Sequence, residues 1–247
     1  GWLARLGLPE ALALGLAFFL GGLKKHDQEY NAGASRVYSS IMLITVIVLA
    51  LAPYVAVMVT SFTKIVVVLS LLRSALGLQQ APPNVVLNGI ALVLTIYVMH
   101  PVGMAMSDKM GPTKDLGSTQ SLLAAADRAK EPLRDFMLKH TKLEERAFFL
   151  RTARKSLAED KAAQLSERDF IVLMPAFTVG ELTSAFTIGF LIFLPFLVID
   201  LVISNILMAM GMQMLTPTTV SLPFKLLLFV AVDGWVNLSH GLVMTYH

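Results

Sequence analysis

Residues 185–235 read AFTIGFLIFLPFLVIDLVISNILMAMGMQMLTPTTVSLPFKLLLFVAVDGW. Two apolar arms, Ile188 to Leu207 and Leu222 to Val232, flank a turn that is rich in methionine. As a helix, the first arm is long enough to cross a hydrocarbon core of about 30 Å, and the second becomes so when Asp233 to Leu242 are added. The stretch therefore predicts a helical hairpin in a membrane.

The composition of the whole chain points to the same class. Of its 247 residues 55% are hydrophobic, and the mean hydropathy is +0.68, which lies beyond the range of soluble globular chains. The net charge of +3 is modest and spread out, so we expect no nucleic-acid partner. There is no cysteine, and the five histidines lack HxxH or HExxH spacing. We therefore expect an integral membrane protein without a metal site or cofactor.

Ionisable residues are few within the apolar sequence, and Asp200 is the most exceptional because it lies in the middle of the first arm. An aspartate at the centre of a membrane helix costs about 2.5 to 3.5 kcal/mol on insertion scales. It could face other protein or an aqueous lumen, or the arm could break there so that Asp200 caps a helix near an interface. The other acids and bases beside apolar sequence are Glu181, Asp233, Lys64, Arg73 and Lys225. With Asp200 included, three acids match three bases, and these equal numbers suggest pairing between helices or subunits, although several could simply lie at membrane interfaces.

The methionines of the turn alternate at a spacing of two around Gly211. A regular helix would scatter such residues around its axis, so a loop or a broken helix end suits them better, with Thr216-Pro217 ending the first arm. These residues are Met208, Met210, Met212 and Met214. Because thioether side chains are flexible and polarisable, several copies around one axis could form a seal that conforms to what passes through. The alternative is that they only fill apolar space.

The chain before this hairpin divides into three parts. Residues 1–40 begin with an apolar run over 1–23, which could be a secretory signal core, a membrane-surface helix or a marginal span, and end with a polar linker. Residues 41–106 predict a first helical hairpin, with a kink at Pro53. Its turn, ALGLQQAPPN, contains Gly77, Pro82 and Pro83.

The two hairpins form a weak internal repeat. ALGLQ at 75–79 matches AMGMQ at 209–213, and the same offset brings Pro83 onto Pro217. If the repeat is structural, the two turns lie on one side of the membrane, an arrangement seen where repeats build transport paths. The last part, residues 171–247, would then be the second hairpin with its methionine turn.

Residues 107–170, between the hairpins, hold most of the charge and predict a small inserted helical domain. Its near balance of charge lets it cross to the periplasmic side, and Lys64 with Arg73 then mark the cytoplasmic side. The predicted helix signals are a start at Ser118 or Thr119, a first turn at Pro132, and capping boxes formed by Thr141 with Glu144 and by Ser166 with Asp169.

Several long blocks resemble the FliP/SctR family of bacterial type III secretion. They are SFTKIVVVLSLLRSALGLQQAPPNVVLNGIAL, LMPAFTVGEL, AFTIGFLIFLPFLVIDLVI, ILMAMGMQML and SLPFKLLLFVAVDGW. The resemblance begins near Ile41 and implies an export-apparatus subunit, present in five copies with SctS/FliQ-like and SctT/FliR-like partners. Together they would form a helical, cone-shaped portal on the periplasmic side of the bacterial inner membrane, surrounded by lipid, through which unfolded polypeptides pass.

The resemblance also implies a role for the methionine turn, which forms a gasket around the closed pore in relatives. Met210, Met212, Gln213 and Met214 occupy that place here. Gln213 departs from the unbroken methionine run of flagellar relatives. The TPTTVSLPF segment is more similar to virulence-type members, so an injectisome protein is favoured. The implied assembly would let Glu181, Asp200, Lys225 and Asp233 meet partners from neighbouring subunits.

Two other classes of function compete with this one. A polytopic small-solute or ion-coupled transporter could use Asp200 and Glu181 as coupling sites, but the four predicted spans enclose no polar cluster of substrate size. An intramembrane enzyme would need a nucleophile with its base or a metal set, and neither spacing occurs. We therefore expect a protein that is not an enzyme.

Overall fold

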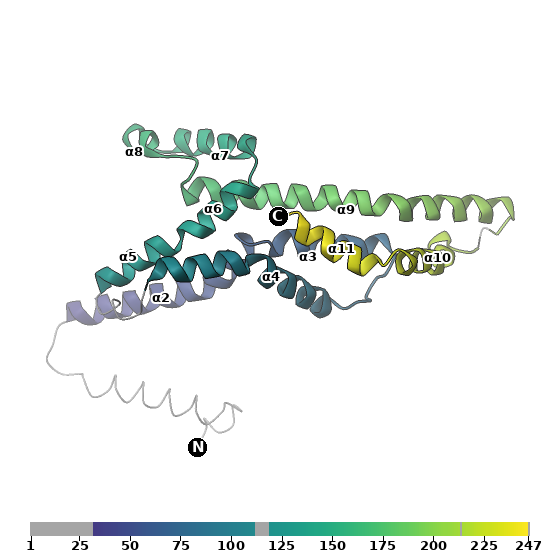
Figure 1. Ribbon diagram of the computed structural model, residues 1–247, viewed down its shortest axis with the longest axis horizontal. Helices are drawn as coiled ribbons and strands as arrows, with labels where there is room; N and C mark the ends of the chain where they lie inside the picture. The colour runs from purple at the N-terminus through teal and green to yellow at the C-terminus, as the bar shows by residue number, and fades with distance from the viewer. Residues whose placement is uncertain (1–31, 112–118, 213, 247) are drawn as a thin grey trace, which may run out of the picture. The chain divides into compact units, whose positions relative to one another are not determined.

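The computed structural model describes residues 32–111, 119–212 and 214–246, and every regular element among them is a helix (Figure 1). The predicted all-α fold class is confirmed. The chain divides into two compact units, 1–53 and 54–247. The predictions for residues 1–23 lie outside the described residues. In the first unit the described residues belong to α2 (Ala32–Met58), which runs through Pro53 as one helix.

The second unit contains nine of the described helices, with α9 the longest. They are α3 (Phe62–Ala75), α4 (Asn84–Met110), α5 (Thr119–Ala129), α6 (Glu131–His140), α7 (Leu143–Ser156), α8 (Glu159–Gln164), α9 (Phe170–Ala209), α10 (Pro217–Ala231) and α11 (Gly234–Met244). α3 packs against both α9 and α4, and α10 packs against the far end of α9. Buried apolar residues of α3, including Ile65, Val68 and Leu69, form the centre of this packing.

The length of α9 exceeds what a membrane can cover. Its 40 residues extend about 60 Å, twice the thickness of a hydrocarbon core. The first turns of α9 pack instead against the inserted helices, where Leu173 and Phe177 join Phe136 and Met137 of α6 in one buried cluster. One continuous helix therefore links the inserted helices to the second hairpin.

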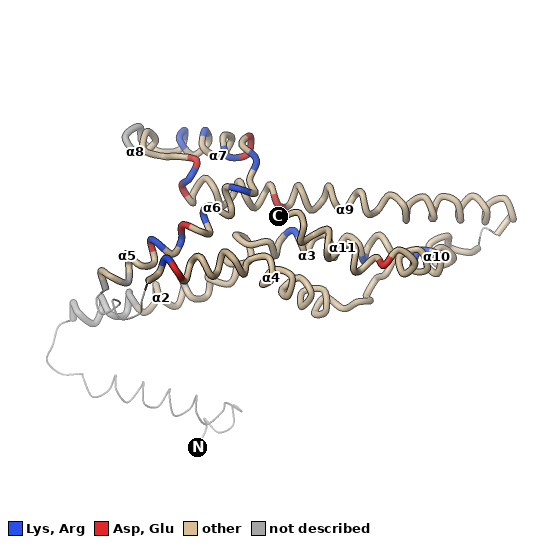
Figure 2. Tube along the Cα trace, in the orientation of Figure 1, with Lys and Arg blue, Asp and Glu red and all other residues tan. Residues whose placement is uncertain are grey.

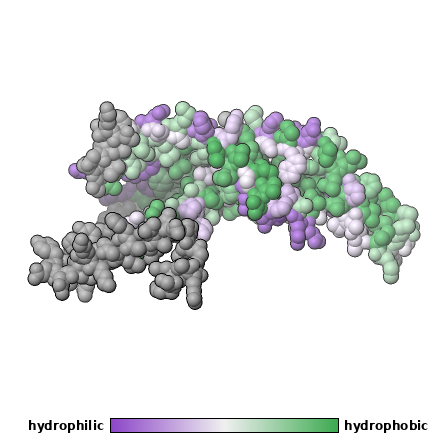
Figure 3. Space-filling model, turned by 90° about the horizontal axis from the view of Figure 1, so that it is seen from below, coloured by the Kyte–Doolittle hydropathy of each residue, from purple (hydrophilic) through white to green (hydrophobic). Residues whose placement is uncertain are grey.

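The surface of the second unit is that of a membrane protein. Among the described residues α4 and α9 are long and apolar enough to cross a membrane, and there are up to four spans if α2 with α3 and α10 with α11 each count as one. Large apolar side chains such as Phe186, Phe190 and Leu201 are exposed along α9. Figure 3 shows hydrophobic residues over much of one face, while charged residues gather on α5 to α7 (Figure 2).

The inserted helices agree with most of the helix signals. α5 begins at Thr119, Pro132 lies in the first turn of α6, and the Asp169 carboxylate accepts bonds from the Ser166 amide and hydroxyl just before α9. The predicted capping box of Thr141 with Glu144 is wrong. The buried Thr141 hydroxyl donates to the Met137 carbonyl at 2.6 Å, because it closes the end of α6 instead of starting α7.

The second arm of the last hairpin is not one straight helix. α10 and α11 meet at 61°, and Asp233 between them has the left-handed backbone with φ of 49°. Gly234 is required at the break, since a Cβ there would overlap the ring of Phe229. The expected single span of Leu222 to Leu242 is therefore a bent pair of helices.

Candidate functional site

The turn after α3 ends the helix with a Schellman motif. The Leu78 amide donates to the Arg73 carbonyl at 3.2 Å, and the Gly77 amide donates to the Ser74 carbonyl at 3.0 Å. This closure requires a left-handed residue after the helix, and Gly77 supplies it with φ of 78°. The end of α3 is therefore set by the left-handed backbone conformation of Gly77.

Arg73 also braces the rest of this turn. Its guanidinium Nη1 donates to the Pro82 carbonyl at 3.3 Å and to Asn84 Oδ1 at 2.5 Å. Pro83 directly precedes α4, whose first residue is Asn84. Arg73 thus ties the end of α3 to the start of α4.

The turn after α9 repeats this geometry. The Met212 amide donates to the Leu207 carbonyl at 3.0 Å, the Gly211 amide donates to the Met208 carbonyl at 3.1 Å, and Gly211 has φ of 71°. Pro217 then begins α10, as Pro83 precedes α4. The repeated sequence is therefore a repeated helix–turn–helix structure.

The first turn packs against α10, the helix that follows the second turn. A Cβ added to Gly77 would approach Thr218 Cγ2 to 3.6 Å and Leu222 Cδ1 to 4.0 Å. The start of α10 is therefore packed against the end of α3. The two hairpins are held together at this contact within one chain.

The methionines at the second turn are exposed. Met214 is 99% exposed, and Met208, Met210 and Met212 are also exposed, while Gln213 lies outside the described residues. Exposed clusters of large apolar side chains mark surfaces that meet another molecule. The turn therefore presents thioethers outward, next to the helix end that Gly211 closes.

Lys225 lies at the centre of a polar network at the end of α3. It is 2% exposed, and its Nζ lies 2.6 Å from Asp200 Oδ2 on α9 and 3.1 Å from the Ala75 carbonyl oxygen at the end of α3. The Ser221 hydroxyl donates to the other Asp200 oxygen at 2.6 Å. The cation is well placed at the carboxyl end of α3, where helix carbonyls concentrate negative potential. One side chain thus connects α3, α9 and α10.

Lys64 and Glu181 form a second buried network at the other end of α3. Lys64 Nζ lies 3.1 Å from Glu181 Oε1, and the carboxylate also accepts a hydrogen bond from the Tyr246 hydroxyl. Lys64 Nζ stands 3.9 Å from the centroid of the Tyr246 ring, a cation–π distance. The segment after α11 is thereby tied to α3 and α9.

Comparison with known proteins identifies this architecture, since the FliP family matches residues 43–242. The chain belongs to the FliP family. Its relatives include Pathogenicity-related ORF2 of Xanthomonas campestris pv. glycines, which is 55% identical over 84% of this chain and 96% of the relative. The Hypersensitivity response secretion protein HrcR of Ralstonia nicotianae is 54% identical over 83% of this chain and 96% of its own length. Yop proteins translocation protein R of Yersinia pestis is 50% identical over 83% and 95%.

Membership of the FliP family confirms the predicted recognition and the predicted class of function, a subunit of the type III secretion export apparatus. The family is a structural component of that apparatus and assembles with other export components. The apolar helices α4 and α9 agree with a membrane protein.

The predicted charged residues have different surroundings in the structure. The interpretation of Asp200 as a helix cap at a break is wrong, because α9 continues to Ala209 and the carboxylate pairs with Lys225. Glu181 pairs with Lys64 in the same chain. Asp233 instead lies exposed at the bend between α10 and α11, where its unusual backbone is the notable feature.

Sequence reasoning missed Tyr246. No sequence pattern near Tyr246 indicates that it is buried, since its partners lie on α3 and α9. Tyr54 and Tyr97 are exposed, whereas Tyr246 is buried among aromatic side chains of α6. Only the packing of the last helix against α3 could identify its role.

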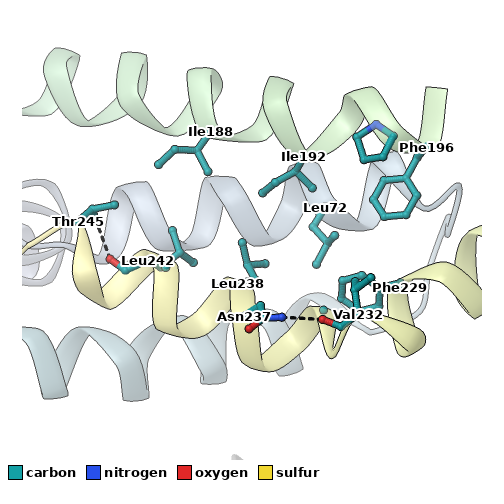
Figure 4. Close-up of a pocket in the computed structure, with 13 residues that line it drawn as sticks. Leu72, Ile188, Ile192, Phe196, Phe229, Val232, Asn237, Leu238, Leu242 and Thr245 are labelled. Carbon is teal, nitrogen blue, oxygen red and sulfur yellow. Dashed lines mark hydrogen bonds between the residues drawn. The ribbon is translucent and has the colours of Figure 1, made fainter. Parts of the chain in front are cut away.

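A cavity of about 440 Å³ lies between α9 and α11 (Figure 4). Its labelled side chains are mostly apolar and include Ile192, Phe196, Leu238 and Leu242. The amide of Asn237 is occupied, since its Nδ2 donates to the Val232 carbonyl at 2.6 Å. Such a lining offers little to hold a polar solute, so the cavity does not support the alternative of a small-solute transporter.

Proposed function

We propose that this chain is a pore-forming core subunit of a type III protein secretion export gate, which conducts unfolded polypeptides across the bacterial inner membrane. The observation that carries the proposal is the methionine turn, which is exposed yet built on a defined backbone. Met212 closes the helix end through its amide while its side chain remains free to contact a neighbour. Family membership and the names of the relatives, a secretion protein and a translocation protein, support this function.

The proposed assembly is a helical portal of five copies with SctS/FliQ-like and SctT/FliR-like subunits. The exposed apolar side chains of α9, including Phe186 and Phe190, extend along a helix of about 60 Å, more than lipid alone would cover. The inserted helices of 107–170 would lie on the periplasmic side, packed on the first turns of α9. The two hairpins, 41–106 and 171–247, would then form the wall.

In this assembly the gasket would consist of Met210, Met212, Gln213 and Met214 from each copy. Flexible thioethers can close around an axis without a fixed shape, which suits a pore that must also admit varied polypeptides. The ion pair of Lys225 with Asp200 would hold α10 on α9, the two helices that flank the turn. We favour the injectisome type over the flagellar type, because the TPTTVSLPF segment is more similar to virulence-type members and the relatives with 54% and 50% identity are a hypersensitivity response secretion protein and a Yop translocation protein.

The gasket is tested by replacing Met212 and Met214 together with alanine and measuring ion leak through the assembled complex in vesicles. We expect basal leak to rise while assembly persists. The matched control is Met244→Ala, because Met244 is also an exposed methionine but lies at the end of α11, away from the turn. A double variant that remains as tight as the parent complex would remove the gasket role.

A further inference from the structure

The last turn of α6 contacts the segment after α11 through three aromatic rings. The His140 ring meets the Tyr246 ring edge to face, with centroids 5.1 Å apart. Phe136 lies 4.7 Å from His140 and stacks on Tyr246 at 5.9 Å. The inserted helices therefore reach the end of the chain through a contact that includes a titratable ring.

The Tyr246 ring already has a cation against it. Lys64 Nζ stands 3.9 Å from its centroid, and among the described residues Glu181 is the one carboxylate that pairs with this lysine and with the Tyr246 hydroxyl. A proton on His140 would place a second positive charge beside this cluster with one negative charge to balance both. The contact is therefore stable with a neutral imidazole and unfavourable with an imidazolium.

The ionisable groups around this contact come from several elements. Lys139 lies beside His140 on α6, Lys64 on α3 and Glu181 on α9. The helices α4 and α5 also pack against α6, and their exposed ionisable residues include His100, Asp108, Lys109, Asp127 and Arg128. Burial, followed by the charges of Lys139 and Lys64, lowers the pKa of His140 to about 4.

We propose that the contact of His140 with Tyr246 is a pH-sensitive link, which holds α6 on the C-terminal segment while His140 is neutral and releases it when His140 is protonated. The inference does not depend on the proposed export function. A histidine whose pKa is lowered from 6.5 to about 4 binds its proton more readily in the released state. The contact is therefore most stable above pH 6.5 and weakens as the pH falls towards 4. At pH 5 the equilibrium constant for docking is lower by up to about 30-fold.

Amide hydrogen exchange of α6 in the full purified complex tests the link. We compare the parent with His140→Phe, which keeps an aromatic ring that cannot be charged, always at the same pH because intrinsic exchange itself depends on pH. At pH 7.5 the two proteins should exchange alike. At pH 5 the parent should exchange faster than His140→Phe. The matched control is His240→Gln, since His240 is exposed on α11 and its loss should leave the parent's pH response unchanged.

A second variant tests the same idea from the opposite side. His140→Lys carries a permanent charge and should exchange at pH 7.5 as the parent does at pH 5. If this variant does not assemble, the comparison with His140→Phe still decides. An exchange ratio between the parent and His140→Phe that is the same at pH 7.5 and pH 5 would overturn the proposal, as would a His240→Gln variant that loses the pH response.

Discussion

Lys225 and Asp200 form an ion pair of 2.6 Å between α10 and α9, and the same ammonium caps the end of α3 at the Ala75 carbonyl. Lys225 thereby links α10 and α9 of the second hairpin to the end of α3 in the first. Lys225 is buried, while the Asp200 side chain is 34% exposed. Loss of the partner therefore costs more for the lysine, because water can solvate the aspartate but not the buried ammonium.

We first predict the effect of removing the aspartate. Asp200→Leu leaves a buried cation without its carboxylate and should destabilise the complex by about 3 kcal/mol, the lower end for breaking a buried pair. The combination with Lys225→Met removes both charges and should be less destabilising than the sum of the two single variants. Thermal unfolding of the purified complex measures this coupling. Additive effects would mean that the pair carries no interaction energy.

A second prediction concerns exchange of the two charges. Asp200→Lys combined with Lys225→Asp restores an ion pair but turns a carboxylate towards the Ala75 carbonyl. We therefore expect the swapped protein to remain less stable than the parent and to secrete less. Recovery of parental secretion by the swap would show that the bond to α3 is unimportant.

The third prediction tests the buried tyrosine. Tyr246→Phe keeps the ring over Lys64 but removes the hydroxyl that donates to Glu181, so we expect a loss of about 1.5 to 3 kcal/mol, typical of a hydrogen bond to a charged group. Tyr97→Phe is the control, since Tyr97 is exposed on α4. Equal effects of the two substitutions on unfolding would contradict the network.

The fourth prediction uses two glycines of the same helix. A Cβ on Gly189 would lie 3.0 Å from Leu71 Cβ, so Gly189→Ala should force α9 away from α3 and cost about 1 to 3 kcal/mol. A Cβ on Gly180 meets nothing within 4 Å, and Gly180→Ala should stabilise the helix by up to about 1 kcal/mol. We expect the free energy of unfolding to fall in Gly189→Ala and to rise in Gly180→Ala. A Gly189→Ala variant as stable as the parent would argue against this packing of α9 on α3.

Local sequence chemistry was enough to predict the helical class, the methionine turn and the repeat. Apolar length identifies helices that can cross a membrane, and glycine at 77 and 211 is the residue that a Schellman closure needs. The Lys225 and Asp200 charges were recognised as requiring partners because an isolated charge in apolar sequence is costly.

Other features depend on tertiary contacts that no local pattern contains. The bend at Asp233 arises where Gly234 makes room for Phe229, and Tyr246 finds Glu181 only after α11 has packed near α3. The Thr141 hydroxyl could bond either to the start of α7 or to a carbonyl of α6. In the structure Thr141 is buried, and its hydroxyl donates to the Met137 carbonyl of α6. The roles of the gasket residues involve neighbouring subunits and stay predictions.

The central claim is that this chain works as one member of a closed assembly, and the mass of the intact detergent-solubilised complex tests it most directly. We predict a mass that contains five copies of the 26.9 kDa chain together with partner subunits. A stable particle with the mass of a single chain, whose methionine turn contacts only detergent, would contradict the account.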